Sequence, residues 1–532
     1  MSAVTRILAT AMLAGTVSQA ATWHVSPAGN DGKDGKTLAN AFATPAKGVA
    51  AASAGDTILL AGGTYKLSET LKLTADGTAN ARICFFAENA ATKRAYLDFS
   101  SQPVASSNQG VYISGDYWHI KGIDVFKAGD NGVLFQGGSN NIMEFCNVHE
   151  NQDAGVQLKG GAANNLILNT DSWWNYDSAT FGGNADGFAP KMDVGSGNTF
   201  RGCRSWGNSD DGWDGYLREP SKTATWTAST TIEDCWAFDN GYYHGDPKSS
   251  KNDRAEMNGN GFKMGGGDKV GSVSNGYGTQ HHHVVRRCLA FNNYAKGFDQ
   301  NNNRGNMTLF NCTGINNGTN YQIDGTAGSS ATPSSGIASG NVLTVKNSIS
   351  TGTGGVKLTA AVEANNTWSN GFAVATSDFL SVDTAGVRGA RKADGSLPDI
   401  AFMHLKTGSK LIDAGAVLSG ITYKGKAPDL GAFETEATVS VEREIVSHRS
   451  KLDVLAGLSS RVVLTAGLES TAHLMISVSD MQGRKVQTRD LGLWLPGPRT
   501  ETVDFSNLQA GMYLVSVRGD NGFAENARLV IR

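Results

Sequence analysis

Four aspartates and one lysine stand at matching offsets in successive repeats in the middle of the chain. The aspartates are Asp186, Asp210, Asp211 and Asp214, and Lys263 follows in the next repeat. Carboxylates gathered within a few ångströms repel one another and require a counter-ion. Hard oxygen ligands in this number suit Ca²⁺, which accepts irregular coordination. The sequence therefore predicts a Ca²⁺ site formed by these four aspartates.

The offsets come from a repeat that an asparagine marks. Six anchor residues are each followed five positions later by an asparagine; the anchors are Cys146, Thr170, Cys203, Cys235, Cys288 and Cys312, and the asparagines are Asn151, Asn175, Asn208, Asn240, Asn293 and Asn317. The anchors are 24, 33, 32, 53 and 24 residues apart, so a coil of about 24 residues recurs with insertions. Apolar and small residues at fixed offsets, with no helical spacing, predict a parallel β-solenoid. Stacked coils place the asparagines one strand spacing apart, where they can form a hydrogen-bonded ladder.

This register predicts which distant residues are neighbours. Asp211 and Asp214 lie three and six residues after a ladder asparagine, and a recurring Gly-aromatic pair makes Asp186 equivalent to Asp211. By the same pair, Lys263 is equivalent to Asp214 on the adjacent coil. Residues three apart face opposite ways on a straight strand, so convergence requires a bend at Gly212. The alternative is that each Asp only caps a turn; four in register favour a functional cluster.

The insertions fall around the same residues. They come before Asp186, after Asp214 and on both sides of Lys263. Long loops on a rigid scaffold tend to carry function, and here we expect them to wall a cleft. His244 and Arg254, in the largest insertion, are candidates for binding an anionic ligand.

The N-terminus and the composition indicate where the protein is located and which classes of partner to expect. Residues 1–20 are typical of a secretory signal peptide, because Arg6 precedes a mostly apolar stretch and a small-x-small cleavage pattern. No later apolar stretch is long enough to span a membrane, so we expect a secreted protein without a membrane span. The net charge of −3 gives no electrostatic reason to expect nucleic acid as a partner.

The remaining pattern divides the chain into domains. Residues 21–435 are predicted to form the parallel β-helix, with coils from about residue 83 to about residue 434. A short helix at residues 45–54, with Thr44 as its N-cap, is expected to cover one open end. Residues 436–449 are predicted to be a linker, and residues 450–532 a small antiparallel β-sandwich with hairpin turns at residues 482–483 and 520–522. The predicted fold is therefore all-β, and we expect a monomer.

Other residues with chemical potential have structural interpretations. Five of the six cysteines occupy the anchor position, which favours a stack of buried thiols over disulfides or zinc. His281, His282 and His283 alternate faces on a strand and cannot share one ion, so we expect exposed strand residues. Four tryptophans could stack on sugars, although packing between coils is the default; they are Trp173, Trp174, Trp206 and Trp236.

Three segments resemble polysaccharide lyase family nine, the pectate lyases with a right-handed parallel β-helix. They are NADGFAPK at residues 184–191, GCRSWGNSDDGWD at 202–214 and NGNGFKMGG at 258–266. The resemblance covers roughly residues 23–434 and implies a Ca²⁺ site at the four aspartates, with Lys263 as the catalytic base. It also implies an acidic polysaccharide, pectate or polygalacturonate, as substrate. The C-terminal region resembles the sorting domains of secreted bacterial proteins, which implies an extracellular or surface-attached enzyme.

The chemistry agrees with this resemblance. In a uronate the C5 proton lies next to a carboxylate, and Ca²⁺ that neutralises this carboxylate stabilises the charge developing during β-elimination. A lysine acts as a base only when its pKa falls; nearby Ca²⁺ lowers it, whereas the aspartates raise it. Lys191, near Asp186, could bind a substrate carboxylate or replace Lys263 as the base.

Two other hypotheses remain open from the sequence. A hydrolase on the same solenoid would use paired carboxylates as acid and base, would not need Ca²⁺ and would give no unsaturated product. A non-catalytic glycan-binding adhesin would use Ca²⁺ structurally and would tolerate replacement of Lys263.

Overall fold

The structure is a computed structural model of the chain. It describes residues 20–435 except 219–225, 243–257, 268–278, 326–336 and 370, and, in the C-terminal part, residues 452–456, 461–468, 471–480, 482–494, 497–504, 508–509, 511–520 and 524–531. Two compact units divide at Thr438 and Val439. Residues 1–19 of the expected signal peptide, the whole linker at 436–449, His244 and Arg254 lie outside the described residues.

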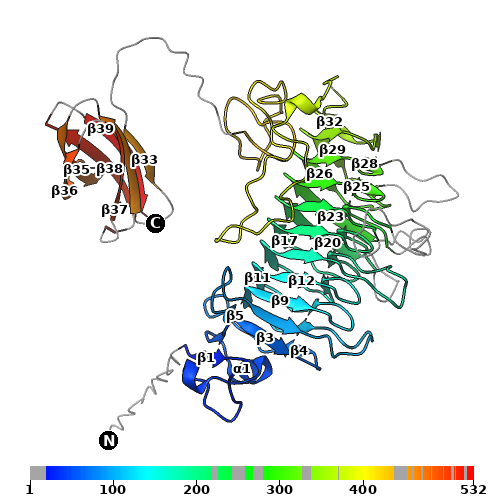
Figure 1. Ribbon diagram of the computed structural model, residues 1–532. Coiled ribbons are helices and arrows are strands. Elements are labelled where there is room, and N and C mark those ends of the chain that lie inside the picture. Colours follow the sequence, from blue (N-terminus) through cyan, green and yellow to red (C-terminus); the bar gives the residue numbers. More distant parts are fainter. Residues whose placement is uncertain are drawn as a thin grey trace, which may run out of the picture. The chain divides into compact units, whose positions relative to one another are not determined.

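Three parallel sheets form the first unit (Figure 1). Sheet A contains β1 (Thr22–Val25), β2 (Thr57–Leu60), β5 (Ile83–Ala87), β8 (Trp118–Lys121), β11 (Ile142–Glu144), β14 (Leu166–Leu168), β17 (Asn198–Arg201), β20 (Trp226–Glu233), β23 (Thr279–Arg286), β26 (Met307–Phe310), β29 (Leu343–Lys346) and β32 (Val362–Ala364). Sheet B contains β3 (Gly63–Lys66), β6 (Ala95–Asp98), β9 (Ile123–Phe126), β12 (Asn147–His149), β15 (Asp171–Trp173), β18 (Arg204–Trp206), β21 (Trp236–Phe238), β24 (Leu289–Phe291), β27 (Thr313–Ile315) and β30 (Ile349–Thr351). Sheet C contains β4 (Leu71–Leu73), β7 (Val111–Ile113), β10 (Val133–Gln136), β13 (Val156–Lys159), β16 (Phe188–Pro190), β19 (Trp213–Asp214), β22 (Phe262–Lys263), β25 (Lys296–Asp299), β28 (Thr319–Asp324) and β31 (Val356–Thr359). The predicted parallel β-helix is confirmed.

The asparagine ladder is also confirmed. The side-chain amide nitrogen of each ladder asparagine donates to Oδ1 of the next one, at 2.8 to 3.0 Å, from Asn151 through Asn293 to Asn317. Between sheets B and C the residue before each of the six has φ between 53° and 61°, which is the left-handed region that turns the chain tightly. A second, shorter ladder joins Asn165 to Asn198 at 3.1 Å between sheets C and A. The sequence interpretation did not include this second ladder.

Aromatic rings from sheet C stack inside the coils. Phe188, Trp213, Phe262, Phe298 and Tyr321 follow one another with ring centroids 4.7 to 5.1 Å apart. Phe188, Trp213, Phe262 and Phe298 are the aromatic members of the Gly-aromatic pairs, so each following residue on the strand faces outward. The five anchor cysteines are buried and free, as expected from the sequence.

The N-terminal end is covered as predicted, but the coils have other limits. Helix α1 (Pro45–Ala51) begins after Thr44, whose hydroxyl accepts a hydrogen bond from the amide of Lys47 at 3.2 Å. A short 3₁₀ helix, η1 (Leu38–Asn40), precedes it. The strands of the three parallel sheets begin at Thr22 and end at Ala364. The expectation of coils over residues 83–434 is therefore wrong at both ends.

Residues 371–435 cover the outer face of sheet B instead of forming coils. They include the 3₁₀ helix η4 (Thr376–Asp378). Their apolar side chains, among them Phe402 and Leu411, pack against Trp206, Trp236 and Phe291 of sheet B. The default interpretation of Trp206 and Trp236 as packing residues is therefore confirmed.

Buried ion pairs tie this covering segment to the coils. The Arg204 guanidinium donates to both carboxylate oxygens of Asp171, at 2.9 and 2.6 Å, and to the carbonyls of Val387 and Gly389. Arg391 donates to the same Asp171 carboxylate at 2.6 Å. The segment is thus attached by hydrogen bonds as well as by apolar contact.

The second unit is a small antiparallel β-sandwich, as predicted. One sheet contains β33 (Leu452–Ala456), β34 (Arg461–Leu468) and β37 (Gly497–Asp504), and the other contains β36 (Lys485–Trp494), β35 (Ala472–Asp480), β38 (Gly511–Gly519) and β39 (Ala524–Ile531). Its core includes Ile476, Trp494 and Val515 with Val503 of the other sheet. The turn at residues 482–483 joins β35 to β36, whereas residues 521–522 of the other predicted turn lie outside the described residues. Among the described residues, no helix is long and apolar enough to cross a membrane.

Candidate active site

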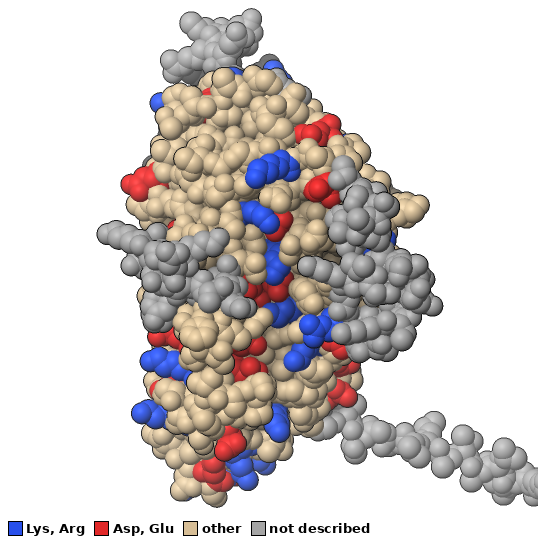
Figure 2. All heavy atoms as spheres, turned by 90° about the vertical axis from the view of Figure 1, so that its right-hand side faces the viewer, with Lys and Arg blue, Asp and Glu red and all other residues tan. Residues whose placement is uncertain are grey.

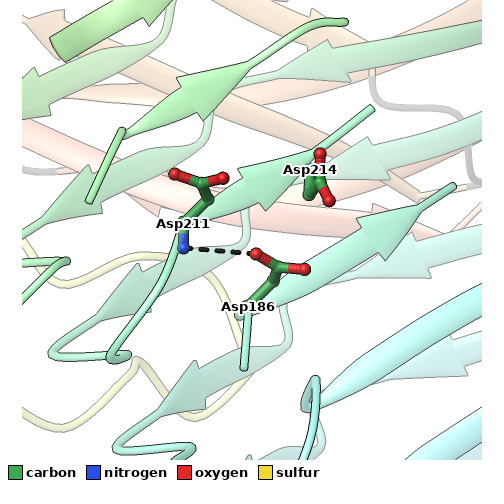
Figure 3. Close-up of side chains that lie close together, drawn as sticks. All are labelled: Asp186, Asp211 and Asp214. Carbon is green, nitrogen blue, oxygen red and sulfur yellow. Dashed lines mark hydrogen bonds between the residues drawn. The ribbon is translucent and has the colours of Figure 1, made fainter. Parts of the chain in front are cut away.

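Three aspartates meet where adjacent coils enter sheet C. Strands β16 and β19 pair at Phe188 and Trp213, and β19 and β22 pair at Asp214 and Lys263, so the predicted register is confirmed. The amide of Asp211 donates to Oδ1 of Asp186 at 3.2 Å (Figure 3). One carboxylate oxygen from each of Asp186, Asp211 and Asp214 lies within 4.8 Å of the other two. The structure therefore brings together three of the four predicted metal ligands.

Asp210 has a different environment from the other three aspartates. Its Oδ2 accepts a hydrogen bond from the amide of Asn184 at 3.0 Å, and its Oδ1 accepts one from the amide of Asn258 at 2.8 Å. Both oxygens thus hold backbone amides that flank the insertions before Asp186 and before Lys263. Asp210 lies beside the three-carboxylate cluster and fixes the ends of two loops.

Two buried lysines interleave with the carboxylates. Nζ of Lys263 lies 3.0 Å from Oδ2 of Asp211 and 3.2 Å from Oδ1 of Asp214. Nζ of Lys191 lies 2.7 Å from Oδ2 of Asp186 and 3.7 Å from Oδ2 of Asp214. The Lys191 and Lys263 side chains are 6% and 9% exposed, so water screens these pairs weakly. The predicted proximity of Lys191 to Asp186 is confirmed.

Burial and mutual repulsion shift the pKa values of the cluster. Burial raises the pKa of Asp211 to about 7, and the charge of Asp210 acts in the same direction against the opposing Lys263. Burial also raises the pKa of Asp186 well above its usual range, although Lys191 opposes it. Burial alone lowers the pKa of Lys263, but the carboxylates of Asp211 and Asp214 outweigh it and raise that pKa well above its usual value. Without a further cation, Lys191 and Lys263 stay protonated, and the raised pKa values of Asp186 and Asp211 make these two carboxyl groups harder to ionise than usual.

The donor set fits a divalent cation. Oδ2 of Asp211 is buried and accepts no hydrogen bond of good geometry, although the Lys263 ammonium is close. Buried carboxylate oxygens within reach of one another are hard ligands, which Ca²⁺ prefers.

Sheet C continues the charged row beyond the cluster. Figure 2 shows Lys and Arg side chains, with Asp and Glu between them, in a line along the face on which β25 and β28 lie. One coil past Lys263, Nζ of Lys296 lies 2.8 Å from Oδ2 of Asp299. This face therefore presents basic side chains at successive coils.

Two histidines lie inside the helix behind the site, and the sequence interpretation of them was wrong. His281 and His283 are buried and face the interior, because their alternation is in phase with the buried apolar residue Val285. Nδ1 of His281 donates to the carbonyl of Gly215 at 3.0 Å, and Nε2 accepts from the hydroxyl of Thr230 at 2.8 Å. His281, His283 and Val285 are two residues apart along one strand and so share a face, and this spacing from an apolar residue was the signal that would have identified the two histidines as buried.

The fold and the site together define a β-helical enzyme that carries a centre of carboxylates and lysines on sheet C. This is the architecture of a polysaccharide lyase. Comparison with known proteins agrees: the family model described as "Pel9A-like, right handed beta helix region" matches residues 23–341. The chain belongs to this family, and its helix is right-handed, as the resemblance implied. A model of the secretion system C-terminal sorting domain matches residues 460–532, which supports secretion or cell-surface localisation.

Curated relatives and solved structures are similar over most of the chain. Pectate lyase L of Dickeya chrysanthemi is 38% identical over 421 residues, which are 77% of this chain and 90% of that protein. Pectate lyase PEL9 of Emericella nidulans is 31% identical over 74% of this chain and 94% of its own length. The crystal structure of pectate lyase Pel9A has a TM-score of 0.67 and 36% identity, covering 79% of this chain and 97% of that one. A rhamnogalacturonan lyase has a TM-score of 0.61 and 27% identity, covering 73% and 97%.

Proposed function

We propose that the protein is a secreted, Ca²⁺-dependent pectate lyase that cleaves polygalacturonate by β-elimination, with Lys263 as the base. The observation that carries the proposal is the position of the Lys263 ammonium between two buried carboxylates, 3.0 and 3.2 Å away. Burying an ammonium together with carboxylates costs desolvation free energy that a wholly apolar cluster would not cost, which favours a functional role for this arrangement.

The aspartates are assigned to the metal. Asp186, Asp211 and Asp214 would hold Ca²⁺, and Asp210, beside them, is retained as the fourth proposed ligand. When bound, Ca²⁺ would supply the positive charge that neutralises the substrate carboxylate and makes its C5 proton more acidic.

Lys263 is assigned to proton transfer. Its Nζ takes the proton from C5, the electrons of that C–H bond form the C4–C5 double bond, and the C4–O bond breaks while the leaving oxygen takes up a proton from solvent water. Lys263 can accept a proton only when Asp211 and Asp214 no longer stabilise its ammonium form, because these two carboxylates raise its pKa. Lys263 can therefore act as the base only after the charges of these two carboxylates are neutralised.

The basic side chains of sheet C are assigned to substrate binding. Lys191, whose Nζ lies 2.7 Å from Asp186, is proposed to bind a uronate carboxylate. His244 and Arg254 are retained as proposed contacts with the acidic polymer. We further propose a monomer that is directed by a signal peptide at residues 1–20 and is attached at the surface through residues 450–532.

A second candidate substrate is rhamnogalacturonan, because a rhamnogalacturonan lyase is among the similar structures. The identity of 27% is lower than the 36% of pectate lyase Pel9A, so polygalacturonate is preferred.

Ultraviolet absorbance of the unsaturated product tests the proposal. The protein is incubated with polygalacturonate or with rhamnogalacturonan, with Ca²⁺ or with a chelator. We expect absorbance to rise with polygalacturonate and Ca²⁺ only. Reducing ends without absorbance would indicate the hydrolase, and neither product would indicate the glycan-binding adhesin.

A further inference from the structure

A cavity outside the charged site opens on the turns between sheets B and C. It has a volume of about 330 Å³ and is lined by Glu150, Asn151, Gln152, Trp174 and Tyr176. These residues follow β12 and β15, on two neighbouring coils. The cavity lies at the start of the insertion that precedes Asp186, and the proposed lyase mechanism does not use it.

Trp174 differs from the other tryptophans of the coils. Trp206 and Trp236 are buried, and Trp173 is stacked between His149 and Trp206 with centroids 4.3 and 4.8 Å away. Trp174 is 42% exposed, so packing between coils does not account for its ring. The ring is available as one wall of the cavity.

The backbone of Trp174 gives a second, independent reason to expect a function. Its φ of 54° lies in the left-handed region, which a bulky side chain adopts rarely. At this position, just before the ladder asparagine, Glu150 of the preceding coil also has a left-handed φ of 56°, while later coils carry Gly207, Asp239, Asn292 and Asn316, whose types tolerate such a backbone. A strained, exposed tryptophan persists where the side chain has a use, because strain of this kind opposes folding.

The polar groups at the cavity indicate the charge of its ligand. Oε1 of Gln152 accepts hydrogen bonds from the amide and the hydroxyl of Ser178, at 3.3 and 2.6 Å, which fixes its side chain at the wall. Among the described lining residues Glu150 is the one that carries a charge, and Nδ1 of its neighbour His149 lies 2.9 Å from its carboxylate. Lysine and arginine are absent from the described lining, whereas Asp153 and Asp177 adjoin lining residues in the chain.

We propose that this cavity binds an uncharged pyranose ring. The apolar face of the sugar would stack on the Trp174 ring, and its hydroxyls would bond to Glu150 and Gln152. A uronate carboxylate would be repelled here by Glu150, in contrast to the lysine-rich face of sheet C. The cavity is therefore a neutral-sugar site separate from the charged one, and it suits a polysaccharide that carries neutral sugars beside its acidic backbone.

Affinity electrophoresis of the full chain tests this site without relying on lyase activity. The gels contain an uncharged pyranose polymer (galactan, xyloglucan or glucomannan), polygalacturonate, or no polymer. Trp174→Asn removes the ring and suits the left-handed backbone, Trp174→Phe keeps an aromatic face, and Phe181→Ala is the control, since Phe181 is exposed on the adjacent loop but does not line the cavity. Thermal unfolding checks that each variant folds.

We expect at least one neutral polymer to retard the wild type. Trp174→Asn should lower that affinity about tenfold, corresponding to about 1.4 kcal/mol of stacking, while Trp174→Phe and Phe181→Ala retain it. The rate on unbranched polygalacturonate should be unchanged in Trp174→Asn, which separates this site from the proposed lyase site. The inference is overturned if no neutral polymer retards the wild type, if Trp174→Asn is retarded like the wild type, or if Trp174 governs retardation by polygalacturonate instead.

Discussion

Replacing Lys263 with alanine should remove catalysis and, in the absence of Ca²⁺, also destabilise the protein. A positioned general base contributes about 10²- to 10⁴-fold to rate, or about 3 to 5 kcal/mol of activation free energy. The ammonium also lies 3.0 and 3.2 Å from the carboxylates of Asp211 and Asp214, which lose this partner in the variant. Leaving a buried charge unpaired costs about 3 to 5 kcal/mol, so the ion-free variant should unfold more readily.

The two effects can be measured separately. Lys263→Arg keeps a positive charge beside Asp211 and Asp214, but a guanidinium stays protonated and cannot act as the base. We expect Lys263→Arg to be nearly inactive with a melting temperature close to that of the wild type, and Lys263→Ala to be inactive with a lower one. Added Ca²⁺ should raise the melting temperature of Lys263→Ala more than that of the wild type, because it supplies the missing charge.

Initial rates of unsaturated product formation and calorimetric melting curves provide these data. If Lys263→Ala keeps a rate within about tenfold of the wild type, equivalent to about 1.4 kcal/mol of barrier, Lys263 is not the base and Lys191 becomes the candidate. If Lys263→Arg is fully active, proton abstraction by this side chain is refuted.

Four further predictions concern the metal, the ladder, the interior and the domains. Asp211→Asn should weaken Ca²⁺ binding in titration calorimetry, and excess Ca²⁺ should restore part of its rate but none of the rate of Lys263→Ala; unchanged affinity would refute the metal site. Asn208→Ala should lower the free energy of unfolding by about 3 kcal/mol, because its ladder neighbours lose buried partners; denaturant titration would contradict this if the loss stayed below about 0.5 kcal/mol. Burial lowers the pKa of His281 from 6.5 to about 4, so the stability that its neutral form contributes is complete above pH 6.5 and falls as the pH decreases towards 4. The loss should reach about 3 kcal/mol, and a His281→Gln variant that kept the same pH dependence would refute this assignment. Deleting residues 450–532 should leave the rate on soluble polymer unchanged, and a folded but inactive truncation would contradict the independence of the two units.

The sequence was sufficient for the part of the structure that repeats. The ladder asparagines and the Gly-aromatic pairs recur at fixed offsets, so counting along the chain predicted that Asp214 and Lys263 are paired on adjacent strands. A single slip of register would have turned one of them inward, which is why a repeated marker makes such a prediction secure. The same counting placed Asp186 beside Asp211.

The parts that could not be predicted are those without a period. The segment at residues 371–435 reaches sheet B through contacts such as Arg391 with Asp171, which are 220 residues apart and follow no pattern. The orientation of Asp210 depends on backbone amides of two insertions, whose paths no repeat specifies.

The asparagine ladder has a consequence for how this enzyme can evolve. Its rungs close with the same length, 2.9 Å, between Asn240 and Asn293, which are 53 residues apart, and between Asn293 and Asn317, which are 24 apart. Each asparagine–asparagine hydrogen bond therefore fixes which coil stacks on which, whatever the number of residues between the two asparagines. Mutation can lengthen, shorten or exchange the loops between rungs while the next coil still returns to its place. Selection can thus alter which polymers the loops admit without having to find a new fold each time.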